Sequence, residues 1–205
     1  GSGTINHLAK LSSRTCGKPY LVCATAPSMN GYPSTNASLL EAGLKVTRPA
    51  QAPAAILADL AILGAAPPAM IRAGRGDLLS QQTALVDWRL SNLVEGTYYC
   101  PAVAGLVAGP IQRASQAADA LNRREDAAVA QLTEALILSG FTMVMAGQSS
   151  PASGADEYST GRPGAEELAR RAIRQPGRHR DLLPLRAAAG GDGRATLGPL
   201  GAPAF

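Results

Sequence analysis

The chain has 205 residues, of which 46% are hydrophobic and 4% aromatic, so it can bury the core of one domain or of two small ones. Its formal net charge of +4 is spread along the chain without a basic cluster, which argues against nucleic acid as a partner. Three cysteines without metal-ligand spacing favour reduced thiols, and no stretch reads as a signal peptide or membrane span, so we expect a soluble cytoplasmic protein.

The first 65 residues predict part of an α/β domain. In chain order they read as a helix opened by a glycine turn at 1–14, an apolar strand at 20–24, a β-excursion at 38–51 that turns at Gly43, and a second strand at 54–60. Ile5, Leu8 and Leu11 fall on one apolar stripe of the helix. Because both strands are short and apolar, we expect a parallel sheet buried on both faces, as in half of a nucleotide-binding domain.

A polar segment at residues 25–37 follows the first predicted strand. It is rich in turn-forming residues and in hydroxyl and amide donors. A loop at the carboxyl end of a parallel strand is where α/β proteins place ligands. The composition alone is equally consistent with a ligand loop and with an ordinary surface turn.

Residues 67–93 predict a short helix, a glycine corner and a long helix. Pro67 and Pro68 suit a first helical turn, because a missing N–H costs little there. Gly74 and Gly76 allow the backbone to reverse, so that Asp77 would cap the long helix at a fixed place.

The long helix has two distinct faces. One is an apolar stripe typical of a core, made by Leu79, Val86, Leu90 and Leu93. The other could line a cleft and carries Asp77, Gln81, Ala84 and Trp88. Asp77 is therefore either a helix cap alone or a functional carboxylate, whereas Asp87 and Trp88 favour a role in helix packing.

The remaining sequence predicts helices and then a change of character. Residues 98–123 read as a helical region interrupted near Pro110, and residues 126–147 as a strongly apolar interior helix. Residues 155–205 are dominated by Ala, Gly, Pro and Arg, so we expect disorder there. The predicted fold class is α/β followed by all-α, with a partial dinucleotide-binding domain at 1–65, a helical domain at 66–150 and a divergent tail at 151–205.

Four separated motifs, each weak alone, form a specific combination. They are Gly1-Ser2-Gly3-Thr4-Ile5-Asn6, then Thr25-Ala26-Pro27-Ser28-Met29-Asn30-Gly31-Tyr32, then Gly74-Arg75-Gly76-Asp77 with Asp87-Trp88, and finally Leu132-Thr133-Glu134-Ala135 with Pro151-Ala152-Ser153-Gly154. In this order, residues 1–154 resemble the sn-glycerol-1-phosphate dehydrogenase family. That family belongs to the dehydroquinate synthase-like and iron-containing alcohol dehydrogenase group.

The resemblance implies a fold and an activity. The fold would be the C-terminal half of a Rossmann-like nucleotide-binding domain, joined to a helical domain for metal and substrate, with Gly1-Ser2-Gly3 native and the first half of the nucleotide-binding domain missing. The activity would be NAD(P)H-dependent reduction of dihydroxyacetone phosphate to sn-glycerol 1-phosphate, with zinc or another divalent metal polarising the ketone. The implied partner is a small phosphorylated substrate.

Site residues follow from the resemblance position by position. The cofactor pyrophosphate would be flanked by the first helical turn, namely Gly3, Thr4, Ile5, Asn6 and His7. Thr25 and Ser28 would contact the cofactor, and Ser34 would reach its nicotinamide side. Asn30 would lie beside the substrate as the catalytic candidate, and Asp77 would be a metal ligand.

The chain departs from the family pattern at several of these positions. The family has Asp where this chain has His7 and Asn30, and commonly Lys where it has Gln81. Glu157 stands where the family has its first metal-binding histidine, and the second falls within the divergent tail. Asp77 and Glu157 are thus the implied metal ligands, although three protein ligands are usual for catalytic zinc.

These departures leave a second hypothesis from another class. The chain could be a catalytically inactive fragment or pseudoenzyme whose helical part serves as an interaction module. Glycerol dehydrogenase-like and dehydroquinate synthase-like activities are lesser alternatives within the enzyme class. A nucleotide-binding sheet without its first strands would also leave an open edge, so we expect self-association into a homo-oligomer or aggregate.

Overall fold

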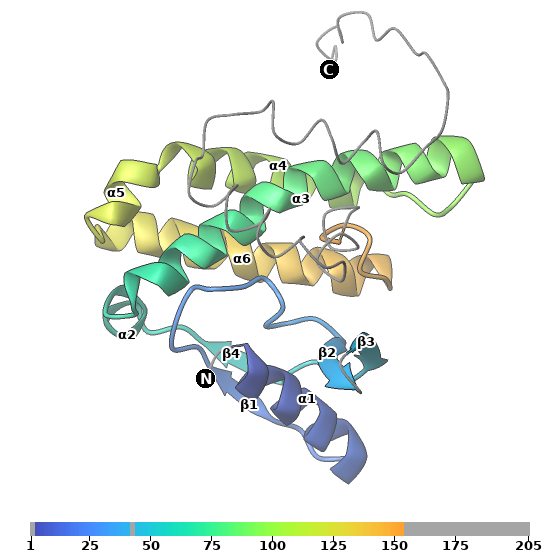
Figure 1. The fold of residues 1–205 in the computed structure, drawn as a ribbon, viewed down its shortest axis with the longest axis horizontal. Helices are drawn as coiled ribbons and strands as arrows, with labels where there is room; N and C mark the ends of the chain where they lie inside the picture. Colours follow the sequence, from blue (N-terminus) through green and yellow to red (C-terminus); the bar gives the residue numbers. More distant parts are fainter. Residues whose placement is uncertain (1–2, 42–43, 154–205) are drawn as a thin grey trace, which may run out of the picture. The chain divides into compact units, whose positions relative to one another are not determined.

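The computed structural model describes residues 3–41 and 44–153, which lie within one compact unit spanning Gly1–Pro163. The elements are α1 (Thr4–Cys16), β1 (Leu21–Cys23), β2 (Asn36–Glu41), β3 (Leu44–Pro49), β4 (Ala55–Leu57), α2 (Leu60–Gly64), α3 (Pro68–Glu95), α4 (Pro101–Gln116), α5 (Ala118–Asn122) and α6 (Asp126–Ala146). Two-stranded sheets follow α1, and helices make up the rest of the described chain (Figure 1). Residues 154–205 of the predicted tail lie outside the described residues.

The predicted strand order is confirmed. β1 and β4 pair in parallel with Val22 opposite Ile56, and β2 and β3 form an antiparallel hairpin between them in the sequence. The predicted turn at Gly43 lies outside the described residues. Asp59 follows β4 and caps α2, since its carboxylate accepts hydrogen bonds from the backbone N–H groups of Ala61 and Ile62 at 2.9 and 3.3 Å.

The prediction that the sheet is buried on both faces is wrong. In the parallel register, Leu21 lies opposite Ala55 and Cys23 opposite Leu57, and all four side chains are exposed. Only the other face of the sheet, which carries Val22, reaches the core. A two-stranded sheet with an apolar outer face is an incomplete version of the parallel sheets of α/β proteins.

Helix α1 is also oriented differently from its sequence pattern. Its apolar residues Ile5 and Leu8 are 62% and 49% exposed. The buried side of the helix is polar and consists of Asn6, Lys10 and Ser13. The polar side faces inward because loop carbonyl groups lie there as hydrogen-bond acceptors.

The predicted glycine corner at Gly74 and Gly76 is wrong, because both residues lie within helix α3. It runs without a break from Pro68 to Glu95, and neither Gly74 nor Gly76 has a positive φ. Asp77 therefore lies inside a helix and is not a cap. A glycine within a helix costs only about 1 kcal/mol relative to alanine, so a glycine pair does not by itself end one.

The buried and exposed faces of α3 are the reverse of those predicted. Val86, Leu90 and Leu93 are between 54% and 72% exposed. The buried side consists of Ile71, Gly74, Leu78, Gln81, Ala84 and Trp88. The face that we expected to line a cleft is thus the packed face, and small residues on it allow close approach to neighbouring segments.

Trp88 confirms the predicted role in helix packing. Its side chain is 2% exposed, and its ring lies edge-on to that of Tyr99 with centroids 4.7 Å apart. The indole N–H donates a hydrogen bond to the carbonyl oxygen of Tyr98 at 2.7 Å. These contacts fix the connection between α3 and α4.

The helical core is built from α3, α4 and α6, which pack against one another (Figure 1). The predicted interruption at Pro110 is wrong, because α4 continues through this proline and ends at Gln116. Val107 and Ile111 flank the proline and are fully buried, so packing outweighs the lost backbone hydrogen bond.

The predicted apolar helix at 126–147 is confirmed as α6. The helix ends at Ala146, and the next residue, Gly147, has a left-handed backbone conformation. We expected no segment to be apolar enough for a membrane span, and this expectation is wrong: by length and composition alone, α6 would be long and apolar enough. Half of its apolar window is buried, and Val129, Leu132 and Leu136 lie in the core, as in the core helix of a globular unit.

Candidate functional site

The site predicted from the sequence centres on the segment between β1 and β2, residues 24–35, which we call the β1–β2 loop. The loop begins at the carboxyl end of a parallel strand, where Ala24 N donates to Leu57 O at 2.9 Å. The hydroxyl of Tyr32 closes it by donating to Ala26 O at 2.6 Å, and Tyr32 is 2% exposed. The loop is therefore packed against the core over part of its length, while Thr25 and Thr35 are exposed.

Two helices contact the loop through glycines. A Cβ atom added at Gly74 of α3 would overlap the carbonyl group of Pro27 and lie 3.0 Å from Leu136. A Cβ atom at Gly140 of α6 would overlap the carbonyl oxygen of Asn30 and the ring of Pro33. Both positions need glycine, because atoms of the loop occupy the space that a side chain would fill.

Asp77 joins α3 to the loop. Its carboxylate accepts a hydrogen bond from the backbone N–H of Asn30 at 2.6 Å. Hydrogen bonds to an ionised acceptor are among the stronger ones in proteins. The loop motif and the helix motif, which are 47 residues apart in the sequence, thus meet at this bond.

Lys10 approaches the loop from α1 and was not singled out from the sequence. Its side chain is fully buried, and its Nζ donates to the carbonyl oxygen of Gly31, to Ser34 Oγ at 2.7 Å and to Asn36 O at 3.3 Å. Burial lowers the pKa of Lys10 from 10.5 to about 7, because desolvation disfavours the charged form. The polar face of α1 was the only signal for this residue.

The first turn of α1 brings part of the predicted cofactor set to the same loop. Gly3 precedes the helix with a φ of 49°, while Thr4 and Ile5 are exposed. Asn6 is 3% exposed and donates to Gly31 O at 3.4 Å. His7 Nδ1 accepts a hydrogen bond from Ser38 N at 3.3 Å, which places the proton of a neutral imidazole on Nε2.

The remaining predicted cofactor residues lie along the loop itself. Thr25 is exposed, and Ser28 is half-buried with its N–H donated to Ala26 O at 3.0 Å. Ser34 is 4% exposed and is bonded to Lys10 as described. His7, Asn30, Ser34 and Asp77 therefore gather around one loop, whereas Thr4, Ile5 and Thr25 point to solvent.

The described residues do not by themselves form a zinc site. Within residues 3–41 and 44–153, no three His, Cys, Asp or Glu side chains lie close enough together to hold a metal ion. The carboxylate of Asp77 is engaged by the backbone of Asn30. Glu157, the second implied ligand, lies outside the described residues.

Gln81 of α3 and Ser139 of α6 are polar side chains that are fully buried. Gln81 is fully buried and its Nε2 donates to Pro151 O at 3.1 Å, which links α3 to the segment after α6. Gln81 Oε1 and the Oγ of Ser139 have no hydrogen-bond partner within the described part of the chain. Gln81 thus has a packing role at the position where the family commonly has lysine.

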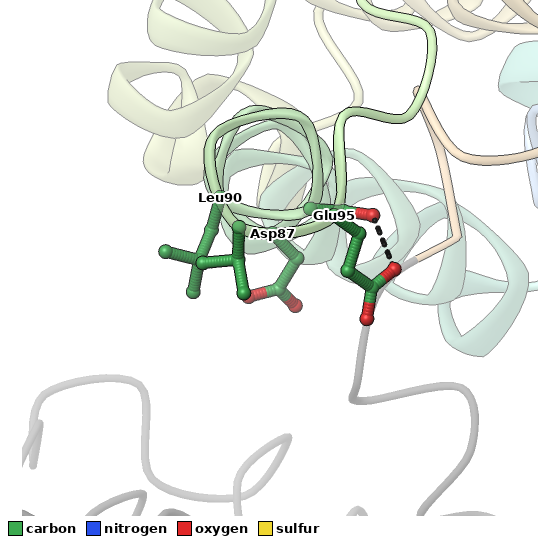
Figure 2. A pocket seen from close by; sticks show the side chains of 5 residues that line it. Asp87, Leu90 and Glu95 are labelled. Atoms are coloured by element: carbon green, nitrogen blue, oxygen red, sulfur yellow. Dashed lines mark hydrogen bonds between the residues drawn. The ribbon is translucent and has the colours of Figure 1, made fainter.

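A separate surface pocket lies on the second half of α3 and has a volume of about 250 Å³. Figure 2 shows Asp87, Leu90 and Glu95 on its wall, with Ser91 Oγ bonded to Glu95 Oε2 at 3.3 Å. Asp87 follows Asp77 by ten residues, which is about 15 Å along a helix. This pocket is therefore distinct from the β1–β2 loop.

Known proteins are similar to this chain over the region that carries the motifs. A family model described as iron-containing alcohol dehydrogenase matches residues 1–67. The glycerol-1-phosphate dehydrogenase (NAD(P)+) of Halalkalibacterium halodurans is 40% identical over 158 residues, which are 77% of this chain and 40% of that protein. The enzyme of the same name from Pyrococcus furiosus is 36% identical over 156 residues, 76% of this chain and 45% of that protein.

Solved structures agree at the level of the fold. A probable glycerol dehydrogenase from Sinorhizobium meliloti matches with a TM-score of 0.62 at 23% identity, over 82% of this chain and 50% of that one. A glycerol dehydrogenase from Schizosaccharomyces pombe matches with a TM-score of 0.63 at 18% identity, over 82% and 44%. The chain spans about 40% of the length of the first curated relative. Residues 1–67 thus match the iron-containing alcohol dehydrogenase model, and about three quarters of the chain is similar to part of glycerol-1-phosphate dehydrogenases.

Proposed function

We propose that this chain carries part of an NAD(P)H-dependent dehydrogenase that reduces dihydroxyacetone phosphate to sn-glycerol 1-phosphate, a precursor for polar lipids. The observation that carries the proposal is the 2.6 Å bond from Asn30 N to Asp77. This bond joins the loop motif to the helix motif, and both belong to the set that resembles the family. The names of the curated relatives support the same reaction and cofactor.

In this proposal, each group of residues has a role that its position supports. The N-terminal turn of α1, with Gly3, Thr4, Ile5, Asn6 and His7, would present backbone N–H groups to the cofactor pyrophosphate. Thr25 and Ser28 would contact the cofactor, and Ser34 its nicotinamide side. Asn30 would lie beside the substrate carbonyl, where its amide group could orient the ketone for hydride transfer.

A divalent metal, zinc in many family members, is a separate part of the proposal. When bound, such an ion polarises a carbonyl oxygen. Asp77 and Glu157 are the proposed ligands, but the described residues alone do not make the site. Metal binding therefore needs a test of its own, separate from cofactor binding.

Calorimetric titrations of the purified chain with NADH and with zinc test both parts. We compare the wild type with Asp77→Asn, which keeps an oxygen acceptor for Asn30 N but removes the charge. Asp87→Asn is the matched control on the same helix, away from the loop. We expect micromolar binding of both ligands by the wild type and the control, and loss of zinc binding in Asp77→Asn. A wild type that binds neither ligand would contradict the proposed function.

The alternative is a catalytically inactive member of the family that acts as a helical interaction module. It is favoured by one observation, namely that the carboxylate of Asp77 already bonds the loop backbone and so has a structural role without a metal. Retention of a cooperative thermal transition by a chain that binds neither zinc nor NADH would support this alternative. Turnover of dihydroxyacetone phosphate with NADH would exclude it.

A further inference from the structure

Lys10 is a long cationic side chain with no exposed surface. Burying an ammonium group is costly unless each of its donors finds an acceptor. Lys10 Nζ meets three oxygens: the carbonyl of Gly31, Ser34 Oγ at 2.7 Å and the carbonyl of Asn36 at 3.3 Å. Three acceptors match the three N–H bonds of an ammonium group, so this cluster is fully paired.

All three acceptors belong to one short stretch that ends the β1–β2 loop and begins β2. The same stretch starts directly after Asn30, whose N–H is bound by Asp77 of α3. The carbonyl oxygen of Asn30 faces Gly140 of α6 so closely that a Cβ atom there would overlap it. The Asn30–Gly31 unit is therefore fixed from α1 by the Lys10 side chain, from α3 by a carboxylate and from α6 by steric contact.

We propose that Lys10 is a positioning residue that holds Gly31–Asn36 in place and thereby sets the orientation of Asn30 and Ser34 toward the ligand. The inference rests on the proposed function, because it assigns Lys10 to the site that this function uses. Lys10 acts through Ser34 and the loop backbone and does not itself touch cofactor or substrate. Its distinguishing property is that one side chain bonds three points of the stretch from Gly31 to Asn36.

The main test compares Lys10→Met with the wild type. Methionine keeps a similar length and removes the ammonium donors, so that the carbonyl oxygens of Gly31 and Asn36 keep only the bonds from Asn6 and Ser34. Lys18→Met is the matched control, because Lys18 is an exposed lysine just beyond α1. Hydrogen exchange measured by mass spectrometry reports on the loop, and titration with NADH by fluorescence reports on its ligand.

We expect amide exchange across residues 28–36 to accelerate at least tenfold in Lys10→Met while exchange in α6 stays unchanged. The dissociation constant for NADH is expected to rise about tenfold, and both quantities should stay at wild-type values in Lys18→Met. Unchanged loop exchange would overturn the proposal. Faster exchange with unchanged NADH affinity would also overturn it, since a purely structural lysine would give that result.

A second variant keeps the test decisive if Lys10→Met does not fold. Ser34→Ala removes one of the three acceptors and leaves the lysine with two. We expect a smaller acceleration of exchange, about threefold, at residues 31–36, and no change there would overturn the proposal. A wild type that fails to bind NADH would overturn the proposed function and the ligand role of Lys10 with it. Unaltered NADH affinity in Lys10→Met would overturn the role of Lys10 alone.

Discussion

At the scale of single residues, the loop is shaped as much by missing side chains as by hydrogen bonds. Gly74 and Gly76 are both interior to α3, and the sequence predicted the same corner role for each. Only Gly74 faces the Pro27 carbonyl group. A Cβ atom at Gly76 would meet no atom of the described chain within 4 Å. The pair therefore gives a matched comparison within one helix.

We predict that Gly74→Ala lowers the free energy of unfolding by about 2–3 kcal/mol, because a methyl group must displace loop backbone. Gly76→Ala should raise it by about 0.5–1 kcal/mol, because alanine has the higher helix propensity. Urea denaturation followed by circular dichroism measures both values. Equal effects of the two substitutions would show that the loop does not contact α3 as closely as described.

Lys10 gives a pH dependence with a definite sign. Burial lowers its pKa in the folded chain to about 7, against 10.5 for an unperturbed lysine. Between these two values the unfolded chain binds a proton that the folded chain has released, so the free energy of unfolding rises with pH. The penalty for burying the charge is complete below pH 7 and disappears as pH approaches 10.5.

We therefore predict that the wild type gains stability from pH 7 to 9 by up to about 1.4 kcal/mol per pH unit relative to Lys10→Met. Urea unfolding at several pH values in this window gives the two slopes. Lys18→Met should keep the wild-type slope because that lysine is exposed. Parallel curves for wild type and Lys10→Met would mean that Lys10 keeps its proton when folded.

At the scale of elements, the sequence predicted which segments are helices or strands better than it predicted their buried faces. The hairpin of β2 and β3, the parallel pairing of β1 with β4, and α6 all match. In α1 and α3 most residues of the predicted apolar stripes are exposed. The buried face of α1 is polar, and that of α3 mixes large apolar residues with Gly74, Gln81 and Ala84. Periodicity reports where apolar residues lie on a helix, but the neighbouring segments decide which face they contact.

The same limit applies to the candidate site. The resemblance brought attention to Asn30, Ser34 and Asp77, and the structure does gather them around one loop. It could not indicate Lys10 or Gly140, because a lysine within a helix usually reads as solvent-exposed and a glycine in an apolar helix as neutral. Their importance depends on loop backbone that approaches from another part of the chain.

Helix α6 offers a test of its role as a core helix. Leu132 is fully buried, whereas Phe141 on the same helix is 45% exposed. We predict that Leu132→Ala lowers the free energy of unfolding by about 2–5 kcal/mol, because it leaves a cavity in the core. Phe141→Ala should cost about 1 kcal/mol or less, and thermal denaturation ranks the two. Similar costs for both would contradict the packing of α6 described above.

At the scale of the whole molecule, the sheet of β1 and β4 is the least complete part of the described chain. Leu21, Cys23, Ala55 and Leu57 form one apolar, exposed face of it. Two strands are fewer than a stable sheet usually needs, and unpaired strand edges favour pairing with another chain. The match to only about 40% of the length of a curated relative is consistent with this incompleteness.

We predict that the chain self-associates through this exposed sheet face, because contiguous apolar surface of this kind is seldom left in contact with water. Sedimentation velocity should show an average mass that rises with protein concentration. Replacing Leu21 and Leu57 together by lysine should shift the chain toward monomer, since two charges on the face oppose its burial. Leu93→Lys is the matched control, because Leu93 is 72% exposed on α3. A wild type that stays monomeric at every concentration would mean that the incomplete sheet is tolerated in water, and an equal effect of Leu93→Lys would place the contact elsewhere.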